Sequence, residues 1–399
     1  MHARQVSHKI LFNTLSWIHK TRLTALEECL LAAIDGKVLS VTGIGRSIDS
    51  DAKEKNCIKR ADRLLSNPHL HLEHRNIYHA VMQLTVGNIQ RPVILVDWSD
   101  LDPSKHHFLI RAAVALDGRS HTLYEQVHTI KTKEKPSVHK AFMRQLKSML
   151  PANCHPIVVT DAGFKTPWFR LVKSLGWDYL GRIRGQILIQ KNENSDWSHA
   201  KELYPSATTT PQFIGCLEMN RSAPFHCQMV LYKGRGKGRH KLNRAGICAA
   251  SKLSKVHSAR EREPWILATS LPLSSTLAKK CVQLYSTRMQ IEESFRDMKS
   301  YRYGIGFSLN LSHDLKRLQT LIMIAMLANL VLWLLGTVAE KSGSAQAYQA
   351  NTVKNRRVLS IIFLGQRVAN DRRFTLDHSQ LDEAYRQLVK LIGIHGYDC

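Results

Sequence analysis

Val93-Ile94-Leu95-Val96-Asp97 is an unbroken apolar run that ends in a carboxylate. Aliphatic residues without a polar break over so short a length are typical of a strand buried on both faces of a sheet. A second run of this kind is Ile157-Val158-Val159-Thr160-Asp161. The two runs predict buried strands that each end in an aspartate.

The segments around these two runs alternate between strand and helix patterns. In chain order the sequence predicts strands at 93–96, 107–116 and 122–130, a helix at 137–150, a strand at 157–160, a helix at 168–175, and strands at 179–183 and 265–269. Shorter strand-like runs at 187–189 and 228–232 interrupt this pattern, and residues 1–90 and the chain beyond 300 have helical periodicity. The prediction is an α/β fold with a mixed sheet and helical regions at both ends.

The chain carries a large positive charge. Its 399 residues include 57 Lys and Arg against 32 Asp and Glu, a formal net charge of +25. Duplex DNA presents one negative charge per ~1.7 Å, so nucleic acid is the partner that this excess favours, with an anionic membrane as the competitor. The longest apolar run, Leu321 to Leu335, contains Asn329 and is shorter than the ~20 residues of a spanning helix. We therefore expect a buried core helix there, no membrane partner, and a cytoplasmic protein.

Two basic segments are candidate DNA contacts. Residues 231–260 hold nine Lys and Arg and no acid, and Gly alternates there with Lys233, Arg235, Lys237 and Arg239. Glycine lets a backbone approach phosphates closely, although a solvated loop is the alternative. In the N-terminal region the basic residues stand beside an apolar stripe, where a solvated helical face is equally consistent: Lys59, Arg60 and Arg63.

A single long helix is expected over 277–299. At ~100° per residue, one carboxylate and four groups that can bind phosphate fall within an arc of about 80°: Tyr285, Arg288, Glu292, Arg296 and Lys299. An ordinary amphipathic surface helix would show the same pattern. Two aspartates from buried strands and a glutamate from a helix nevertheless match the hard oxygen ligands of a site for two Mg²⁺ ions about 3.5–4 Å apart.

Four sequence blocks resemble one known family. Tyr285-x2-Arg288-x3-Glu292-x6-Lys299 resembles the Tyr-Arg-Glu-Lys signature of bacterial DDE transposases of insertion-sequence family four, closest to the insertion-sequence-ten (transposon-ten) type. The segments 96–100, 160–164 and 181–185 look like that family's other blocks. The resemblance extends from about Ile58 to Arg356 and so covers most of the chain.

The resemblance implies a ribonuclease-H-like core that is interrupted by a β-rich insertion. The implied domains are a helical DNA-binding region at 1–90, core segments at 91–183 and 263–340, a basic insertion at 184–262, and a helical region at 341–399 that could serve dimerisation. It implies that Asp97, Asp161 and Glu292 bind two Mg²⁺ ions, for which Mn²⁺ can substitute. It also implies that DNA ends are held by Tyr285, Arg288 and Lys299, and that Trp265 stacks on a flipped base.

The activity implied is cut-and-paste transposition. Such an enzyme binds inverted terminal repeats, cleaves the transposon ends through a hairpin intermediate, and joins the 3′ ends to target DNA. Its partners are double-stranded DNA and a second protomer in the DNA complex, and its place is the nucleoid of a bacterial cytoplasm. Two rival classes remain open: a metal-dependent DNA nuclease of the same fold without strand transfer, and a non-catalytic DNA-binding relative.

Overall fold

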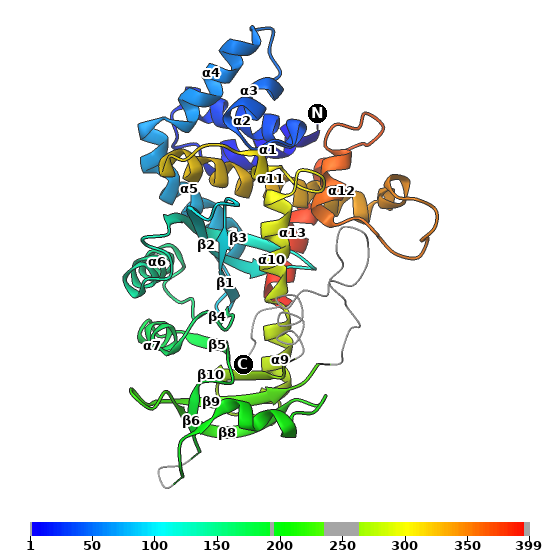
Figure 1. Cartoon of the computed structure of the whole chain (residues 1–399). Coiled ribbons are helices and arrows are strands. Elements are labelled where there is room, and N and C mark those ends of the chain that lie inside the picture. Colours follow the sequence, from blue (N-terminus) through cyan, green and yellow to red (C-terminus); the bar gives the residue numbers. More distant parts are fainter. Residues whose placement is uncertain (1, 192–194, 235–262, 395–399) are drawn as a thin grey trace, which may run out of the picture. The chain divides into compact units, whose positions relative to one another are not determined.

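The computed structural model describes residues 2–191, 195–234 and 263–394, and every structural statement below concerns these residues. The chain forms two compact units (Figure 1). The first unit contains residues 1–154 and 289–399, and the second contains residues 155–288. Each unit is described by itself.

The first unit is built mainly from helices around a three-stranded sheet. Its N-terminal helices are α1 (His2–Thr14), α2 (Lys20–Gly36), α3 (Val41–Ser47), α4 (Glu54–Leu65) and α5 (Pro68–Val86). After the strands come α6 (Pro136–Met149), α10 (Met289–Lys299), α11 (Leu315–Lys341), α12 (Ile361–Val368) and α13 (His378–Ile394), with short 3₁₀ turns η2 (Phe307–Leu309) and η3 (Ser344–Tyr348). The helical character predicted for residues 1–90 and beyond 300 is confirmed.

Three antiparallel strands form the sheet of the first unit. They are β1 (Val93–Asp100), β2 (His107–Ala115) and β3 (Ser120–Thr129), in the order β3-β2-β1. The β2–β3 turn contains Gly118 with φ +71°, a backbone conformation that glycine adopts without strain. These strands lie close to the predicted ranges, with one difference. The pairing of β1 with β2 continues through Ser99 and Asp100, so Asp97 lies inside the strand and not at its end.

Helix α11 forms the core of the first unit. Its composition and length would suit a membrane span, yet 94% of its most apolar window is buried inside the structure. It packs against α12 at two glycines, where an added Cβ would meet backbone oxygens at 2.0 Å for Gly336 and 1.9 Å for Gly365. The prediction that 321–335 belongs to a buried core helix is confirmed.

The second unit contains a mixed sheet of seven strands among the described residues. Its strands are β4 (Ile157–Thr160), β5 (Asp178–Ile183), β6 (Leu188–Gln190), β7 (Ser198–His199), β8 (Gln212–Met219), β9 (Phe225–Tyr232) and β10 (Trp265–Thr269), in the order β4-β5-β10-β9-β8-β6-β7. Strands β4 and β5 are parallel, and the other pairs are antiparallel. The helices are α7 (Thr166–Ser174), the 3₁₀ helix η1 (Ala200–Ser206) and α9 (Leu277–Ser286). The predicted mixed α/β character is confirmed.

The prediction of one helix over 277–299 is wrong. Helix α9 ends at Ser286, and α10 begins at Met289. The hydroxyls of Ser286 and Thr287 donate to the carbonyls of Val282 and Leu284 at 2.7 Å, and the amide of Arg288 donates to the Tyr285 carbonyl, three residues back. Side-chain bonds of this kind compete with the regular ladder and tighten the last turn. The 80° arc therefore does not extend across the break.

Candidate active site

Asp97 lies on the face of β1 that α10 covers. Its neighbour in register on β2 is Arg111, and its Oδ1 accepts a hydrogen bond from the amide of Trp98 at 2.8 Å. Side chains alternate along a strand, so Asp97 and Ser99 point to the same face. The Nζ of Lys299, the last residue of α10, donates to the Ser99 hydroxyl at 2.8 Å. The structure thus places Lys299 beside the strand that carries Asp97.

Lys299 is half-buried in this position. Burial lowers the pKa of its ammonium group, an effect that Asp100 opposes and Arg111 reinforces. A lysine held in this way has already lost part of its hydration. It can therefore approach a phosphate oxygen at a smaller desolvation cost than a fully solvated lysine.

Glu292 lies in the first turn of α10 and is half-buried. Phe295 and Lys299 follow at positions i+3 and i+7, on the same stripe of the helix. Phe295 packs its ring 4.6 Å from the Arg111 guanidinium, and Lys299 reaches Ser99, so this stripe faces the sheet. Asp97 and Glu292 thus belong to two elements of the first unit that pack against each other.

A buried ion pair lies below α10. The Nε of Arg111 donates to Glu125 at 2.7 Å, and the hydroxyl of Tyr78 donates to the other carboxylate oxygen at 3.0 Å. Burial raises the pKa of Glu125, and Arg111 opposes this rise. The Nη2 of Arg111 also contacts the sulfur of Met298 on α10 at 3.2 Å. Arg111 therefore joins the sheet to α10 from a position that water does not reach.

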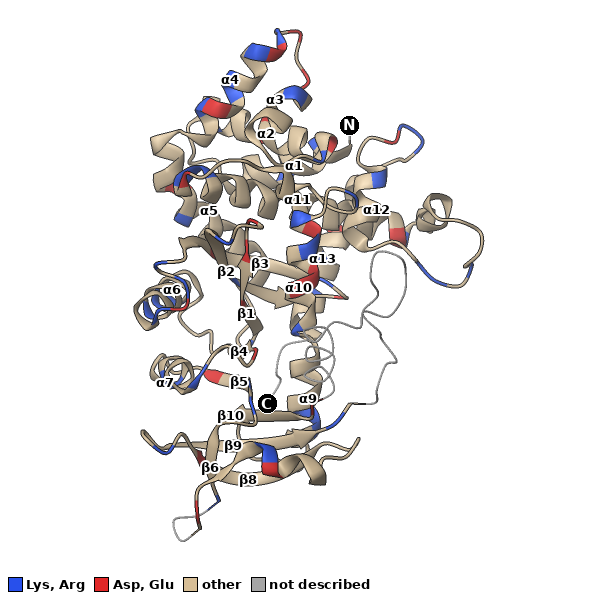
Figure 2. Ribbon diagram, viewed as in Figure 1, with Lys and Arg blue, Asp and Glu red and all other residues tan. Residues whose placement is uncertain are grey.

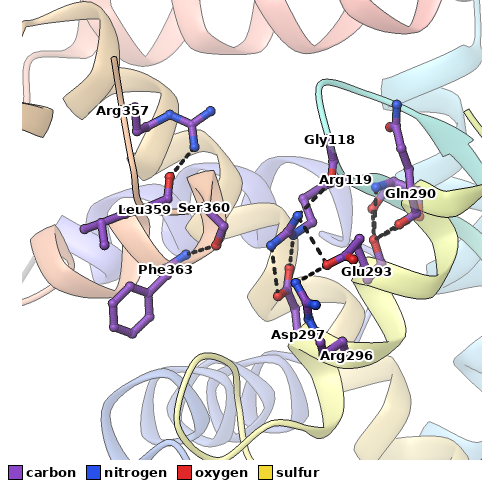
Figure 3. A network of polar contacts seen from close by, with 12 residues as sticks. Gly118, Arg119, Gln290, Glu293, Arg296, Asp297, Arg357, Leu359, Ser360 and Phe363 are labelled. Carbon is purple, nitrogen blue, oxygen red and sulfur yellow. Dashed lines mark hydrogen bonds and ion pairs between the residues drawn. The ribbon is translucent and has the colours of Figure 1, made fainter. Parts of the chain in front are cut away.

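Hydrogen bonds and ion pairs fix the opposite side of α10 to the β2–β3 turn (Figure 3). Arg119 pairs with Asp297, and its Nη1 lies 3.8 Å from Glu293. The Gln290 side chain accepts from the amide of Leu116 at 2.8 Å, and further bonds join Ser120 and Ser294. The helix that carries Glu292 is held along two sides, which restricts how Glu292 can move.

In the second unit, Asp161 directly follows β4, as predicted. Its Oδ1 accepts from the amide of Gly163 at 2.8 Å, and its side chain is half-buried. An added Cβ at Gly163 would lie 3.0 Å from that oxygen, so a side chain there would crowd the carboxylate. The short turn after β4 thereby sets the orientation of Asp161.

Tyr285 is the centre of a second group of predicted residues. Burial raises the pKa of its phenol, Asp161 adds to the rise, and Arg288 and Arg182 oppose it. The ring of Trp265 packs edge-on against the Tyr285 ring with 4.8 Å between centroids. The second unit therefore gathers an acid, two arginines and two aromatic rings. Arg182 was not among the predicted site residues, although the block at 181–185 contained it.

The chain matches a known protein-family model over most of its length. Residues 88–330 match the family model described as the transposase DDE domain, which is more than half of the sequence. The chain belongs to the transposase DDE domain family. No curated protein matches it. The matched range contains Asp97, Asp161, Tyr285, Glu292 and Lys299.

Membership in the transposase DDE domain family makes DNA the substrate and a divalent metal the general cofactor. Carboxylate oxygens, the donors of Asp97, Asp161 and Glu292, are ligands that Mg²⁺ and Mn²⁺ favour, so the donor set fits such a metal. No group of three or more His, Cys, Asp or Glu side chains suited to a metal occurs among the described residues. Asp97 and Glu292 lie in the first unit, and Asp161 lies in the second. A metal site formed by all three carboxylates is therefore a proposal.

The remaining predicted DNA contacts of this transposase domain chain have different environments. Figure 2 shows basic and acidic residues along α4. Lys59 and Arg63 of this helix are exposed, whereas Arg60 pairs with Glu28. Arg296 is exposed and pairs with Glu293. Lys233 is exposed just after β9, and three predicted contacts lie outside the described residues: Arg235, Lys237 and Arg239.

Proposed function

We propose that this protein is a cut-and-paste DNA transposase of insertion-sequence family four, closest to the insertion-sequence-ten type. It binds inverted terminal repeats, cleaves each transposon end through a hairpin intermediate, and joins the 3′ ends to target DNA. The observation that supports it most is the packing of α10 on β1, which places Lys299 of the four-residue signature against the strand of Asp97.

The catalytic residues in this proposal are Asp97, Asp161 and Glu292, which would hold two Mg²⁺ ions. When bound, such ions activate an attacking water or hydroxyl and neutralise charge on the leaving oxygen. Each carboxylate is oriented by its own element. The turn after β4 fixes Asp161, and the contacts on both sides of α10 limit the movement of Glu292.

Tyr285, Arg288 and Lys299 hold the strand end in this proposal. The phenol of Tyr285 can donate a hydrogen bond to a phosphate oxygen, and burial raises its pKa above the ordinary value, which favours this protonated form. Arg288 supplies a planar fork of donors and Lys299 an ammonium group. Trp265 is half-buried against Tyr285, which leaves part of its ring for stacking on a base.

Two DNA ends must be joined in one reaction, so we propose a homodimer in the DNA complex, with residues 341–399 as the contact region. The basic DNA contacts would be Lys59, Arg60 and Arg63 in the N-terminal region, Arg296 on α10, and the residues from Lys233 to Arg239. Because its substrate is chromosomal DNA, we propose that the enzyme is located in the bacterial cytoplasm, at the nucleoid.

The test replaces Asp97 by its uncharged isostere. In Asp97→Asn we expect metal-dependent cleavage of a transposon-end duplex to fall by at least about 10³-fold, because a metal ligand is lost, while the Kd for that duplex without metal changes little. Asp117→Asn is the matched control, since Asp117 is exposed in the β2–β3 turn. Full cleavage by Asp97→Asn would show that Asp97 is not a metal ligand of the active site.

A second assay separates transposition from its alternatives. The wild-type protein receives pre-cut ends with free 3′-hydroxyls, a target plasmid and Mg²⁺. Joined products support strand transfer. Cleavage of intact ends without joining would indicate a DNA nuclease, and binding without either reaction would indicate a non-catalytic relative.

A further inference from the structure

The second unit contains a cavity of about 890 Å³ that the proposed chemistry does not use. It begins at Ala162, the residue after Asp161, and its walls come from the start of α7, the β5–β6 connection and the β8–β9 turn. The site residues Tyr285, Arg288 and Trp265 do not line it. The cavity is therefore a separate feature that opens beside the turn of a proposed catalytic carboxylate.

The lining of this cavity is basic. Lys165, Arg184 and Arg221 contribute to it, and no acidic side chain does so among the described residues. Lys165 and Arg221 are exposed, and the Nη1 of Arg184 lies 3.8 Å from Glu263. Neutral residues that can hydrogen-bond also line it: Thr166, Gln186, Asn220 and Ser222. Three cations from three walls, with no carboxylate among the described residues that line the cavity, indicate an anionic ligand.

Two walls of the cavity are tied together. Arg170 of α7 donates to the carbonyls of Ala223 and Pro224 in the β8–β9 turn, at 3.0 Å and 2.6 Å. Asn220, which precedes Arg221, has φ +69°, and its amide donates to the Leu188 carbonyl at 2.9 Å. The backbone of these walls is thus held in place before any ligand binds, which reduces the ordering cost of binding.

The size of the cavity suits a small ligand. Its volume lies within the range of ~300–1,000 Å³ that is typical of sites for small organic ligands, so a short stretch of one strand matches it better than a duplex. Ala162, Pro167, Ile187 and Leu188 give it apolar surface for sugars, and no aromatic ring from the described part of the chain lines it for base stacking. This combination suits contacts to a sugar–phosphate backbone without reading of sequence.

We propose that this cavity binds the sugar–phosphate backbone of a single DNA strand next to the cleavage site. The identity of the ligand as DNA rests on the proposed function. Lys165 and Arg221 contact successive phosphates from two different walls, and the cavity accepts the strand where it separates from the duplex.

The experiment uses the full chain in EDTA, so that cleavage does not occur. A blunt duplex is compared with the same duplex carrying a tail of four unpaired nucleotides, at its 5′ or its 3′ end. We expect one of the two tails to increase the affinity of the wild type about tenfold, and the double variant Lys165→Gln/Arg221→Gln to lose that gain. Each phosphate contact on a single strand contributes ~0.7 to the slope of log Kd against log salt. The double variant loses two such contacts, so its slope for the tailed DNA should be smaller than that of the wild type by about 1.4.

The matched control is Lys173→Gln/Lys279→Gln, which removes two exposed charges of the same unit that do not line the cavity. This control should retain the tail preference. The proposal is overturned if neither tail increases wild-type affinity, or if both double variants behave alike. Tail binding by a wild type that fails to cleave with Mg²⁺ would contradict the proposed function and leave the cavity assignment intact.

Discussion

His74 shows how one residue couples the stability of the first unit to pH. It is buried on α5, and its Nε2 lies 3.1 Å from the hydroxyl of Thr320 on α11, which donates to the Lys316 carbonyl. Burial, with a smaller effect from His71, lowers the pKa of His74 from 6.5 to about 3. Between about pH 3 and pH 6.5 the imidazole is therefore neutral in the folded protein and protonated in the unfolded chain.

The sign of the effect follows from this difference. Below pH 6.5 the unfolded chain binds a proton that the folded protein does not, so stability falls as pH decreases toward 3. At pH 5 the loss for one such group is about 2 kcal/mol. His121 and His139, whose pKa values are also lowered by burial, add to it.

His74→Gln tests this coupling, because glutamine can donate to Thr320 but does not titrate. We expect the difference in Tm between pH 7 and pH 5 to be smaller in the variant than in the wild type. Equal differences in the two proteins would show that His74 is protonated in the folded state. The exposed His69 supplies the control His69→Gln, which should leave the difference unchanged.

At the scale of the element, Arg119 anchors α10 to the β2–β3 turn. Its partner Asp297 is 3% exposed, and burial raises the pKa of that carboxyl while Arg119 opposes the rise. Removing the guanidinium leaves a buried carboxylate without its cation. In Arg119→Gln we expect a loss of about 2–4 kcal/mol in the free energy of unfolding, and weaker cleavage because Glu292 is less well held.

The second substitution Asp297→Asn should recover part of that stability, because it removes the unpaired charge. Chemical denaturation of the wild type, both single variants and the double variant gives the coupling between the two residues. Additive effects would show that the ion pair does not stabilise α10.

The elements also show what the sequence could and could not predict. The strands β4 and β10 were predicted to the residue, because short apolar runs between turn residues carry a strong local signal. The α9–α10 break was missed, since the hydroxyl bonds of Ser286 and Thr287 are a local competition that periodicity does not register.

Contacts distant in sequence were not predictable either. The Lys299–Ser99 bond joins residues 200 positions apart. Arg119 contacts Glu293 and Asp297, which lie more than 170 positions away along the chain. Such pairs depend on how α10 packs on the sheet, which a pattern along one segment does not encode. The cavity lined by Lys165 and Arg221 was missed for the same reason, because its walls come from three separate connections.

At the scale of the whole molecule, the net charge of +25 predicts how DNA binding responds to salt. Each phosphate that a basic side chain neutralises contributes about 0.9 to the slope of log Kd against log salt on duplex DNA. The largest concentration of charge, nine Lys and Arg without an acid, falls in residues 231–260. If this segment follows a phosphate backbone, it accounts for a defined share of the slope.

The triple variant Arg235→Gln/Lys237→Gln/Arg239→Gln measures that share. We expect its slope on a transposon-end duplex, measured without metal, to be smaller than that of the wild type by about 2.7, three contacts of ~0.9 each. The charge-matched control Lys140→Gln/Arg144→Gln/Lys147→Gln removes three basic residues from the exposed face of α6. If only the overall charge mattered, the two triple variants would have equal slopes, because both lower the net charge by three. A local DNA contact would lower the slope only in the first variant. Equal slopes would therefore show that residues 231–260 make no local contact with DNA and that the affinity of this protein for DNA comes from its other basic surfaces.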